Sequence, residues 1–468
     1  MMFLLDAVNA IVLGYFVLIG LVYLITTGIA LATLRRYARR LRTVDAEDLI
    51  SLGAVPPITL LVPAHNEEAT IVQAVRALLT LRYPDYEILV INDGSTDATT
   101  DRLQHAFDLE PAVRAPTARL PHAEILRIWR SRQHPGLWVL DKVNGRKADA
   151  MNAGLAFCRT PLFCAMDADT LLERDALSRI VRPFLERADT VGAGGIVRIA
   201  NGCTVRDGQV TEVKLPKNLL ARFQVLEYFR AFLAGRLGWS VLNGTLIISG
   251  AFGLFRRRAV VDIGGFATDT VGEDMELVVR LHRRLRDLGQ GYRIVFVPDP
   301  VAWTEAPHTM RSLGTQRERW HRGLTQVMIR HRGMLFRPRY GILGMVAYPY
   351  FFFLEMLGPI IELIGYGSFA IALVLGRVSV PFMLAFFFFA FVLGAALSMA
   401  AIALEEMSFR RYTRFSDLGA LMLMAALEPF GYRQINAYWR FRGLVGAGLG
   451  RMAWGTMPRA GFAGEPAA

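Results

Sequence analysis

The sequence predicts an α/β domain with a mostly parallel sheet, joined to transmembrane α-helices. Two observations lead to this prediction. Segments typical of strands and helices alternate from Pro57 onward, and such alternation builds parallel sheets. The 468-residue chain is also 53% hydrophobic, which is too apolar for an ordinary soluble protein and predicts membrane spans.

The first predicted element is a transmembrane anchor. Residues 7–34 are almost uninterruptedly apolar, long enough to cross ~30 Å of hydrocarbon. No basic region precedes them, so we expect a retained anchor rather than a cleaved signal peptide. Five arginines follow: Arg35, Arg36, Arg39, Arg40 and Arg42. Cytoplasmic flanks are rich in Arg and Lys, so the next domain is predicted to be cytosolic. Residues 1–42 form the anchor and its basic flank, and residues 43–56 form a linker.

Charge and cysteine content narrow the class of protein. The net charge of +12 arises largely from arginines beside apolar runs, which fits anionic membrane lipid and topology signals better than nucleic acid. Cys158, Cys164 and Cys203 show no pairing or metal-ligand spacing. We therefore expect reduced thiols in a cytosolic domain.

Residues 57–340 are predicted to form the cytosolic catalytic domain. Its expected strands are 58–62, 86–91, 137–140, 162–166, 191–205 and 294–298, with a further apolar segment at 245–255. Its expected helices are 66–81, one ending near 107, 147–158, 173–188, 218–237, 273–288 and 313–331. Residues 123–132 are predicted to be a helix or a loop.

The C-terminal membrane region is predicted over residues 341–438, before a basic tail at 439–468. We expect spans at about 342–375 and 380–404, and an interfacial or spanning segment at 418–437. Glu355 and Glu362 fall seven residues apart in the first span. Carboxylates at such depth face bundle interiors or wet cavities, so these two are candidates to line a saccharide or lipid path; an interfacial position is the alternative.

Carboxylates follow two of the predicted strands. Asp93 ends the second strand, and Asp167 and Asp169 follow the strand at 162–166. The carboxyl ends of parallel strands meet at one rim, where open α/β sheets bind ligands. Asp93 can accept a hydrogen bond from a base or a ribose. The pair Asp167 and Asp169 suits a hard cation bridging to a diphosphate. Ordinary solvated or capping turns would explain the same residues.

Three further charged residues stand at predicted helix starts. Lys147 lies at the start of a helix, where the dipole disfavours a cation, so a local anion such as a diphosphate is expected. Glu273 and Asp274 open another helix, and Asp274 can act as a general base toward a sugar hydroxyl. Helix capping is the alternative for these two carboxylates.

A third helix carries Gln316, Arg319 and Trp320 on one face, because residues at i, i+3 and i+4 are neighbours. A guanidinium binds phosphate bidentately, and an indole offers a flat apolar surface to a sugar. A basic interfacial helix ahead of the membrane would show the same composition.

Six motifs occur in one order along residues 57–323: Val62-Pro63-Ala64-His65-Asn66-Glu67, Asn92-Asp93-Gly94-Ser95-Thr96-Asp97, Lys147-Ala148-Asp149-Ala150-Met151-Asn152, Asp167-Ala168-Asp169, Gly272-Glu273-Asp274 and Gln316-Arg317-Glu318-Arg319-Trp320. In these motifs the chain resembles the inverting, family 2 glycosyltransferases. Among them it is similar to the membrane-embedded cellulose, hyaluronan and poly-N-acetylglucosamine synthases.

The resemblance implies a GT-A fold, a nucleotide-diphosphate sugar donor of the UDP-sugar type, and Mg²⁺ or Mn²⁺ as cofactor. It implies a multi-pass protein of the inner (cytoplasmic) membrane that extends a β-linked polysaccharide. Saccharide or lipid-linked acceptors, membrane lipid and partner subunits for export are the implied partners, and nucleic acid is not.

The resemblance also assigns roles to residues. The donor site would contain Pro63, Asn66, Glu67, Asp93, Lys147, Asp167, Gln316 and Arg319. Asp169 would bind the metal, Asp274 would be the catalytic base with Glu273 beside it, and Trp320 would contact the acceptor. Gly250 and Phe252, in Ser249-Gly250-Ala251-Phe252-Gly253, stand where such enzymes cradle the acceptor sugar.

Two features depart from the cellulose synthase pattern. Gly272 stands where those enzymes have Thr, and the chain has fewer predicted spans. One alternative is therefore a non-processive transferase that adds a single sugar to a lipid acceptor. Another is a membrane scaffold or transporter with a vestigial transferase domain, which the complete set of acidic positions disfavours.

Overall fold

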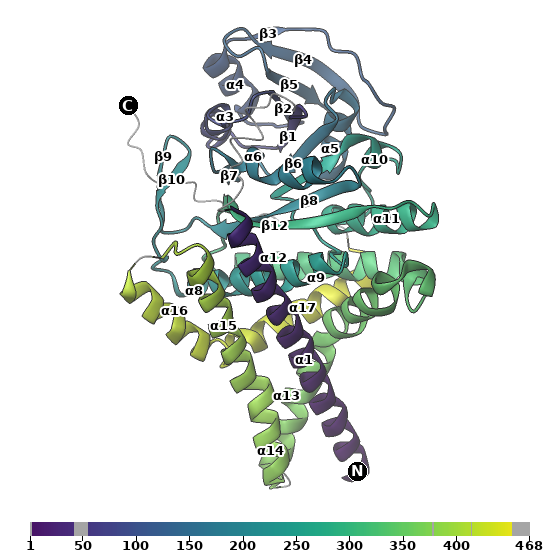
Figure 1. The fold of residues 1–468 in the computed structure, drawn as a ribbon, viewed down its shortest axis with the longest axis vertical. Coiled ribbons are helices and arrows are strands. Elements are labelled where there is room, and N and C mark those ends of the chain that lie inside the picture. The colour runs from purple at the N-terminus through teal and green to yellow at the C-terminus, as the bar shows by residue number, and fades with distance from the viewer. Residues whose placement is uncertain (1, 42–54, 377–378, 413, 452–468) are drawn as a thin grey trace. The chain divides into compact units, whose positions relative to one another are not determined.

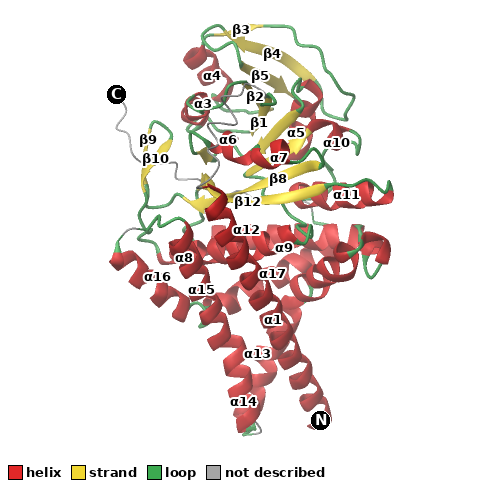
Figure 2. Ribbon diagram, viewed as in Figure 1, coloured by secondary structure: helices red, strands yellow, loops and turns green. Residues whose placement is uncertain are grey.

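A computed structural model describes residues 2–41, 55–376, 379–412 and 414–451, and the chain divides into two compact units. Figures 1 and 2 locate the elements of each unit. The first unit contains Met1–Arg36, Leu215–Gly244 and Pro307–Pro458. The second contains Tyr37–Lys214 and Thr245–Ala306. Sequence reasoning treated 57–340 as one domain; in the structure, parts of that range pack with the N- and C-terminal helices.

The second unit is built on a ten-stranded sheet with the order β3-β4-β5-β2-β1-β6-β11-β8-β12-β7. The strands are β1 Ile58–Ala64, β2 Tyr86–Asp93, β3 Leu109–Pro111, β4 Ile125–Ser131, β5 Leu137–Lys142, β6 Leu162–Met166, β7 Leu171–Leu172, β8 Thr190–Ile199, β11 Phe252–Arg256 and β12 Arg293–Thr304. A separate antiparallel hairpin pairs β9 Thr204–Arg206 with β10 Gln209–Glu212.

Most strands of this sheet point the same way. β1 pairs in parallel with β2 and β6, β2 with β5, and β8 with β12. β4, β7 and β11 run against their neighbours. The predicted mixed, mostly parallel sheet is confirmed. The carboxyl ends of β1, β2, β5 and β6 therefore share one rim.

Short helices accompany the sheet. They are α3 Ile71–Leu79, α4 Thr99–Phe107, α5 Arg146–Phe157, α6 Ala176–Ile180, α7 Arg182–Glu186, α10 Arg257–Val261 and α11 Glu273–Asp287. Small residues let α5 pack closely: a Cβ added at Gly154 would lie 2.9 Å from Ile91 Cδ1 and 3.1 Å from Leu61 Cδ2. Because α5 begins after β5, this packing brings its first turn to the rim.

Two local predictions in this unit were wrong. Residues 123–132 were expected to be a helix or loop but contain strand β4, whose apolar and aromatic residues pair antiparallel with β5. The helix expected from residue 66 begins at Ile71, because Asn66 has a positive φ of 55° and a turn follows it.

The first unit is helical. Its α-helices are α1 Met2–Leu41, α8 Leu219–Tyr228, α9 Leu237–Val241, α12 Met310–Arg330, α13 Gly358–Val374, α14 Val380–Phe387, α15 Leu393–Ser408, α16 Phe415–Leu427 and α17 Tyr432–Gly448. Its π and 3₁₀ segments are η1 Phe229–Arg236, η2 Arg332–Met334, η3 Pro338–Tyr340, η4 Leu343–Ala347, η5 Tyr350–Met356 and η6 Phe388–Val392. The last five residues of α1 group with the second unit.

Two helical stretches of the described chain, Ala7–Tyr37 and Val380–Ser408, are long and apolar enough to cross a membrane. They match the predicted anchor and the predicted span at 380–404. Leu343–Met356 and Gly358–Val374 pass the same test together, but they meet at a 43° bend. The apolar helix α16 has 13 residues, or about 20 Å at 1.5 Å per residue, which is too short for a span.

The bend separates the two carboxylates that were expected on one helical face. Glu355 lies in η5, where it accepts hydrogen bonds from Tyr350 at 2.7 Å and Tyr23 at 3.3 Å and pairs with Arg440 at 3.1 Å. Glu362 lies in α13 and accepts a hydrogen bond from Tyr15 at 2.8 Å. Polar groups of α1 and α17 thus satisfy both carboxylates.

Helix α17 packs along α12 through glycine contacts. A Cβ at Gly443 would lie 2.4 Å from the Glu318 carbonyl oxygen, and one at Gly314 would lie 2.7 Å from Trp439 Nε1. Arg442 also reaches Glu318 at 3.4 Å. The C-terminal helix is therefore a close support for the helix that carries Gln316, Arg319 and Trp320.

We predict that Gly443→Ala destabilises the first unit by about 1–3 kcal/mol, because a backbone carbonyl cannot yield to the new methyl group. Gly448→Ala, in the same helix with nothing within 4 Å of its added Cβ, is the matched control and should change little. Thermal unfolding of the detergent-solubilised protein measures both. Equal midpoints for the two variants would contradict the close packing.

Candidate active site

Asp93, the last residue of β2, accepts hydrogen bonds from residues at and just after the end of β5. Its carboxylate is buried, and Oδ1 accepts hydrogen bonds from Lys142 Nζ at 2.6 Å and the Gly145 amide at 2.9 Å. The Asp93 carbonyl also accepts a hydrogen bond from Asn144 Nδ2 at 2.7 Å. Strand pairing explains the first contact, because Asp93 and Lys142 are register partners in parallel strands.

Lys147 occupies the first turn of α5 and meets carboxylates from two other elements. Its Nζ lies 2.5 Å from Asp167 Oδ1, just after β6, and 3.4 Å from Glu273 Oε1, at the start of α11. Burial opposes the lysine's charge, but Asp167 and Glu273 outweigh it and raise the pKa of Lys147 above its usual value. The ammonium thus neutralises part of an acidic cluster.

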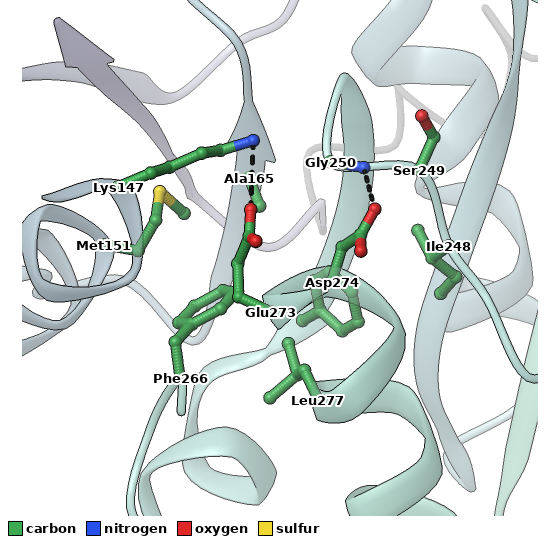
Figure 3. A pocket seen from close by; sticks show the side chains of 11 residues that line it. Lys147, Met151, Ala165, Ile248, Ser249, Gly250, Phe266, Glu273, Asp274 and Leu277 are labelled. Carbon is green, nitrogen blue, oxygen red and sulfur yellow. Dashed lines mark hydrogen bonds and ion pairs between the residues drawn. The ribbon is translucent and has the colours of Figure 1, made fainter. Parts of the chain in front are cut away.

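Glu273 is the buried carboxyl of this cluster, with 5% of its surface exposed. Burial raises the pKa of Glu273 above the ordinary value for a glutamate; Lys147 lowers it and neighbouring Asp274 raises it. Figure 3 shows Lys147 and Glu273 directed toward one another across the pocket. The carboxyl of Glu273 can therefore offset part of the positive charge that Lys147 presents to a bound anion.

Asp274 lies beside a loop that precedes β11. Its Oδ2 accepts a hydrogen bond from the Gly250 amide at 3.1 Å, and its Oδ1 accepts one from the Met275 amide at 2.7 Å (Figure 3). A Cβ at Gly250 would lie 2.8 Å from Lys147 Nζ and 3.6 Å from Asp274 Oδ2. A side chain at this position would displace the lysine ammonium, whereas the aspartate would meet it at ordinary contact distance.

A buried histidine holds the start of that loop to α11. His282 Nε2 lies 2.9 Å from the Thr245 carbonyl oxygen, and Nδ1 lies 2.7 Å from the Tyr292 hydroxyl. A carbonyl only accepts, so Nε2 carries the proton and Nδ1 accepts from Tyr292. Burial lowers the pKa of His282 to about 4; the Thr245 carbonyl opposes this shift, and Arg286 adds to it. The ring is neutral at physiological pH.

The turn after β6 carries the two carboxylates that the sequence pattern associated with a cation. Asp167 and Asp169 are half-buried, and the Thr170 amide closes the turn on the Asp167 carbonyl at 3.2 Å. The described residues contain no group of three or more His, Cys, Asp or Glu side chains that could hold a metal. Mg²⁺ usually takes one or two protein carboxylates, with substrate phosphates and water completing its shell. This donor set fits such a cation.

The predicted donor residues Asn66 and Glu67 brace the loop after β2. Asn66 Oδ1 accepts a hydrogen bond from the Thr96 amide at 2.8 Å, and the Asn66 amide donates to Ser95 Oγ at 2.9 Å. The Glu67 amide donates to Thr99 Oγ1 at 2.9 Å. Pro63 lies near the end of β1, three residues before Asn66. Their contacts with a donor stay predictions.

The remaining predicted residues belong to α12 of the first unit. Gln316 is buried, and its Oε1 accepts no hydrogen bond from the described residues. Trp320 is 43% exposed, and the Arg317 guanidinium lies 4.7 Å from its ring centroid. Arg317 also pairs with Glu227 of α8. Arg319 lies one residue before Trp320, so Gln316, Arg319 and Trp320 share the helix as predicted.

Phe252 is a correction to the predicted acceptor site. It is fully buried in β11 and paired in register with Met166, so its side chain is not available to a sugar. Ser249 and Gly250, just before it, line the pocket instead. The apolar side of this pocket was not predicted; it includes Met151, Ile248, Phe266 and Leu277 (Figure 3).

Lys142 and His282 were also missed. The predicted strand ended at residue 140, two positions short of Lys142, although extending β5 would have aligned this lysine with Asp93. His282 carries no motif, and only its spacing of two turns from Asp274 along α11 gives a signal.

A family comparison identifies the class of protein to which this site belongs. The model described as "Glycosyltransferase like family 2" matches residues 56–323, more than half of the chain. The chain belongs to this glycosyltransferase family. The match starts just before β1 and ends within α12, and it includes every predicted site residue.

Two bacterial relatives show how far the similarity extends. The chain is 28% identical over 282 residues to the poly-beta-1,6-N-acetyl-D-glucosamine synthase of Staphylococcus aureus, covering 60% of this chain and 58% of that protein. It is 28% identical over 276 residues to the enzyme of that name from Staphylococcus epidermidis, covering 59% and 56%. The match therefore spans little more than half the length of these relatives.

A solved structure supports the GT-A fold. The mannosyltransferase PcManGT of Pyrobaculum calidifontis, in complex with GDP-Man and Mn²⁺, superposes with a TM-score of 0.53. The alignment covers 92% of this chain and 99% of that one at 19% sequence identity. At that identity the similarity concerns the fold alone. It confirms the expected architecture of the glycosyltransferase.

We predict that the glycosyltransferase loses about 2 kcal/mol of stability through His282 between pH 7 and pH 5. A depressed folded-state pKa contributes stability that is present above about 6.5, the unfolded value, and lost as pH falls toward about 4. His282→Gln should flatten this part of the profile measured by thermal unfolding. The control, His105→Gln at an exposed position, should keep the wild-type slope. Parallel profiles for wild type and His282→Gln would refute the assignment.

Proposed function

We propose that this protein is a membrane-bound inverting glycosyltransferase that transfers a sugar from a UDP-sugar donor to a growing β-linked polysaccharide. The observation that carries the proposal is that Lys147, Glu273 and Asp274 line one pocket at the rim of the sheet. Lys147 also pairs there with Asp167. The names of the bacterial relatives support N-acetylglucosamine as the sugar and a polysaccharide as the product.

In this proposal the donor lies along the rim. Asp93 accepts a hydrogen bond from the nucleoside, and Lys147 binds the diphosphate in exchange for its present contact with Asp167. Gln316 and Arg319 approach the donor phosphates, and Trp320 contacts the acceptor end. Asp169, with Asp167, would hold Mg²⁺ or Mn²⁺, which when bound offsets the negative charge that develops on the leaving diphosphate.

Asp274 is the proposed general base. Its Oδ2 faces the Gly250 amide, so the acceptor hydroxyl approaches where the loop and the carboxylate meet. The carboxylate takes the hydroxyl proton as the oxygen attacks the anomeric carbon from the face opposite the diphosphate. An α-linked donor then gives a β-linked product. The Gly250 and Met275 amides hold the base in one orientation for this step.

The membrane segments set the proposed location. The arginines after the first span, beginning with Arg35 and Arg36, favour a cytosolic catalytic domain at the inner membrane. The apolar helix Val380–Ser408 and the bent pair before it support a multi-pass topology. Membrane lipid, a saccharide or lipid-linked acceptor, and subunits for export are the proposed partners.

We predict that Asp274→Asn lowers the turnover number by about 10²–10⁴-fold, because general-base catalysis contributes that much, and leaves UDP affinity nearly unchanged. UDP release and product size are measured from purified membranes with a panel of UDP-sugars and Mg²⁺ or Mn²⁺. Asp262→Asn, an exposed aspartate on another helix end, is the control. Wild-type turnover by Asp274→Asn would exclude the base assignment, and a single glycolipid product would favour the one-sugar transferase.

Asp169→Ala is expected to abolish metal-dependent turnover of the donor while the protein still folds, because the cation loses a carboxylate ligand that only substrate and water could replace. UDP release is titrated against Mn²⁺ concentration, and thermal unfolding checks the fold. An unchanged Mn²⁺ dependence in a folded Asp169→Ala protein would remove Asp169 from the metal site.

A further inference from the structure

A fully buried lysine joins the two halves of the donor rim. Lys142, the last residue of β5, has no exposed side-chain surface. Its Nζ lies 2.6 Å from Asp93 Oδ1 at the end of β2 and 2.6 Å from Asp149 Oδ1 in the first turn of α5. It also donates to the Val143 carbonyl at 2.7 Å. The ammonium thus donates two hydrogen bonds and forms an ion pair with a second carboxylate.

The contacts of Lys142 make the two carboxylate oxygens of Asp93 unequal. Oδ1 receives Lys142 and the Gly145 amide, whereas Oδ2 receives no hydrogen bond from the described residues. One oxygen is thus anchored to the fold, and the other remains an acceptor for an N–H or O–H group. Uracil offers such a group at N3, and a ribose offers its hydroxyls. Cytosine has an unprotonated nitrogen at the position of the uracil N3–H.

The second contact of Lys142 reaches the helix that carries Lys147. Asp149 lies two residues after Lys147 in the first turn of α5, and its carboxylate accepts the Ala123 amide at 3.0 Å. A Cβ at Gly145 would lie 2.3 Å from Asp149 Oδ1, so the chain just before α5 is packed against this carboxylate. Lys142 therefore ties the strand end that bears Asp93 to the helix start that bears Lys147.

We propose that Lys142 is a positioning residue for nucleotide recognition: it orients Asp93 as a single-oxygen acceptor and holds it in register with Lys147. The inference rests on the proposed function, in which Asp93 meets the nucleoside and Lys147 the diphosphate. Lys142 itself touches neither, because it is enclosed. Its loss leaves the buried Asp93 and the half-buried Asp149 without their shared cation, and Asp93 is then free to turn.

The chain provides a matched control for a buried cation between β2 and α5. Arg114 pairs bidentately with Glu87, near the start of β2, at 2.7 and 3.0 Å. Its Nε donates to the Phe157 carbonyl, at the end of α5, at 3.0 Å. Arg114 thus links the same strand and the same helix at their opposite ends, away from the rim. Its side chain is 1% exposed.

The test measures binding of UDP, GDP and CDP to the full-length protein in detergent by titration calorimetry, with thermal unfolding in parallel. Lys142→Met is expected to weaken UDP binding about ten- to a hundredfold, the effect of losing one or two hydrogen bonds to a charged group. It should also reduce the preference for UDP over CDP. Arg114→Met should destabilise the fold but keep the UDP affinity and the preference for UDP.

A double variant guards against failure of Lys142→Met to fold. Lys142→Met with Asp149→Asn keeps the net charge of the buried cluster at its wild-type value and retains an acceptor for the Ala123 amide. It should show the same loss of affinity and preference. UDP binding by either Lys142 variant that equals binding by Arg114→Met would overturn the positioning role while leaving the proposed function intact.

Binding of UDP, GDP and CDP to the wild type separates a failure of the proposed function from a failure of the positioning role of Lys142. A wild type that binds GDP rather than UDP would refute the UDP donor, and the same comparison of variants with GDP would still decide the role of Lys142. A wild type that binds none of the three diphosphates would overturn both the proposed function and the positioning role.

Discussion

The rim of this glycosyltransferase carries closely spaced carboxylates, and its structure depends on lysines that neutralise them. Parallel strands bring Asp93 and Asp167 to one edge of the sheet, and α11 adds Glu273 and Asp274. Such a cluster would repel itself without cations. Lys142 compensates the nucleoside end from inside the fold, and Lys147 compensates the pocket from its border. The enclosed lysine is held between two carboxylates, whereas the bordering one can exchange a carboxylate for a diphosphate.

Backbone contacts complete this arrangement where side chains would not fit. Gly250 brings an amide to Asp274 because it has no Cβ to displace Lys147. The loop that contains it is held at its start by His282, from the same helix that carries Asp274. Asp274 and the loop therefore share one support, and a neutral buried histidine maintains it without adding charge near the carboxylates.

The rule that the carboxyl ends of parallel strands meet at one edge of a sheet predicted most of the rim from sequence. Asp93, Lys147 and Asp167 could be placed together because each follows a recognisable strand or opens a helix. Asp274 was joined to them only by the family resemblance. Lys142 could not, since no motif marks it and only the register of β5 against β2 reveals its partner. Phe252 was misassigned because an apolar loop and a buried strand share the same composition. The grouping of 215–244 and 307–340 with the terminal helices depends on tertiary packing, which periodicity does not record.

The central claim is that the acidic rim and its two lysines form one nucleotide-diphosphate site. An experimental structure with UDP and Mn²⁺ bound tests it most directly. The account predicts the uridine at Asp93 Oδ2, the diphosphate at Lys147 and Mn²⁺ at the turn of Asp167 and Asp169, with Lys142 still enclosed between Asp93 and Asp149. A nucleotide bound away from this rim, or an Asp93 carboxylate that makes no contact with it, would contradict the account.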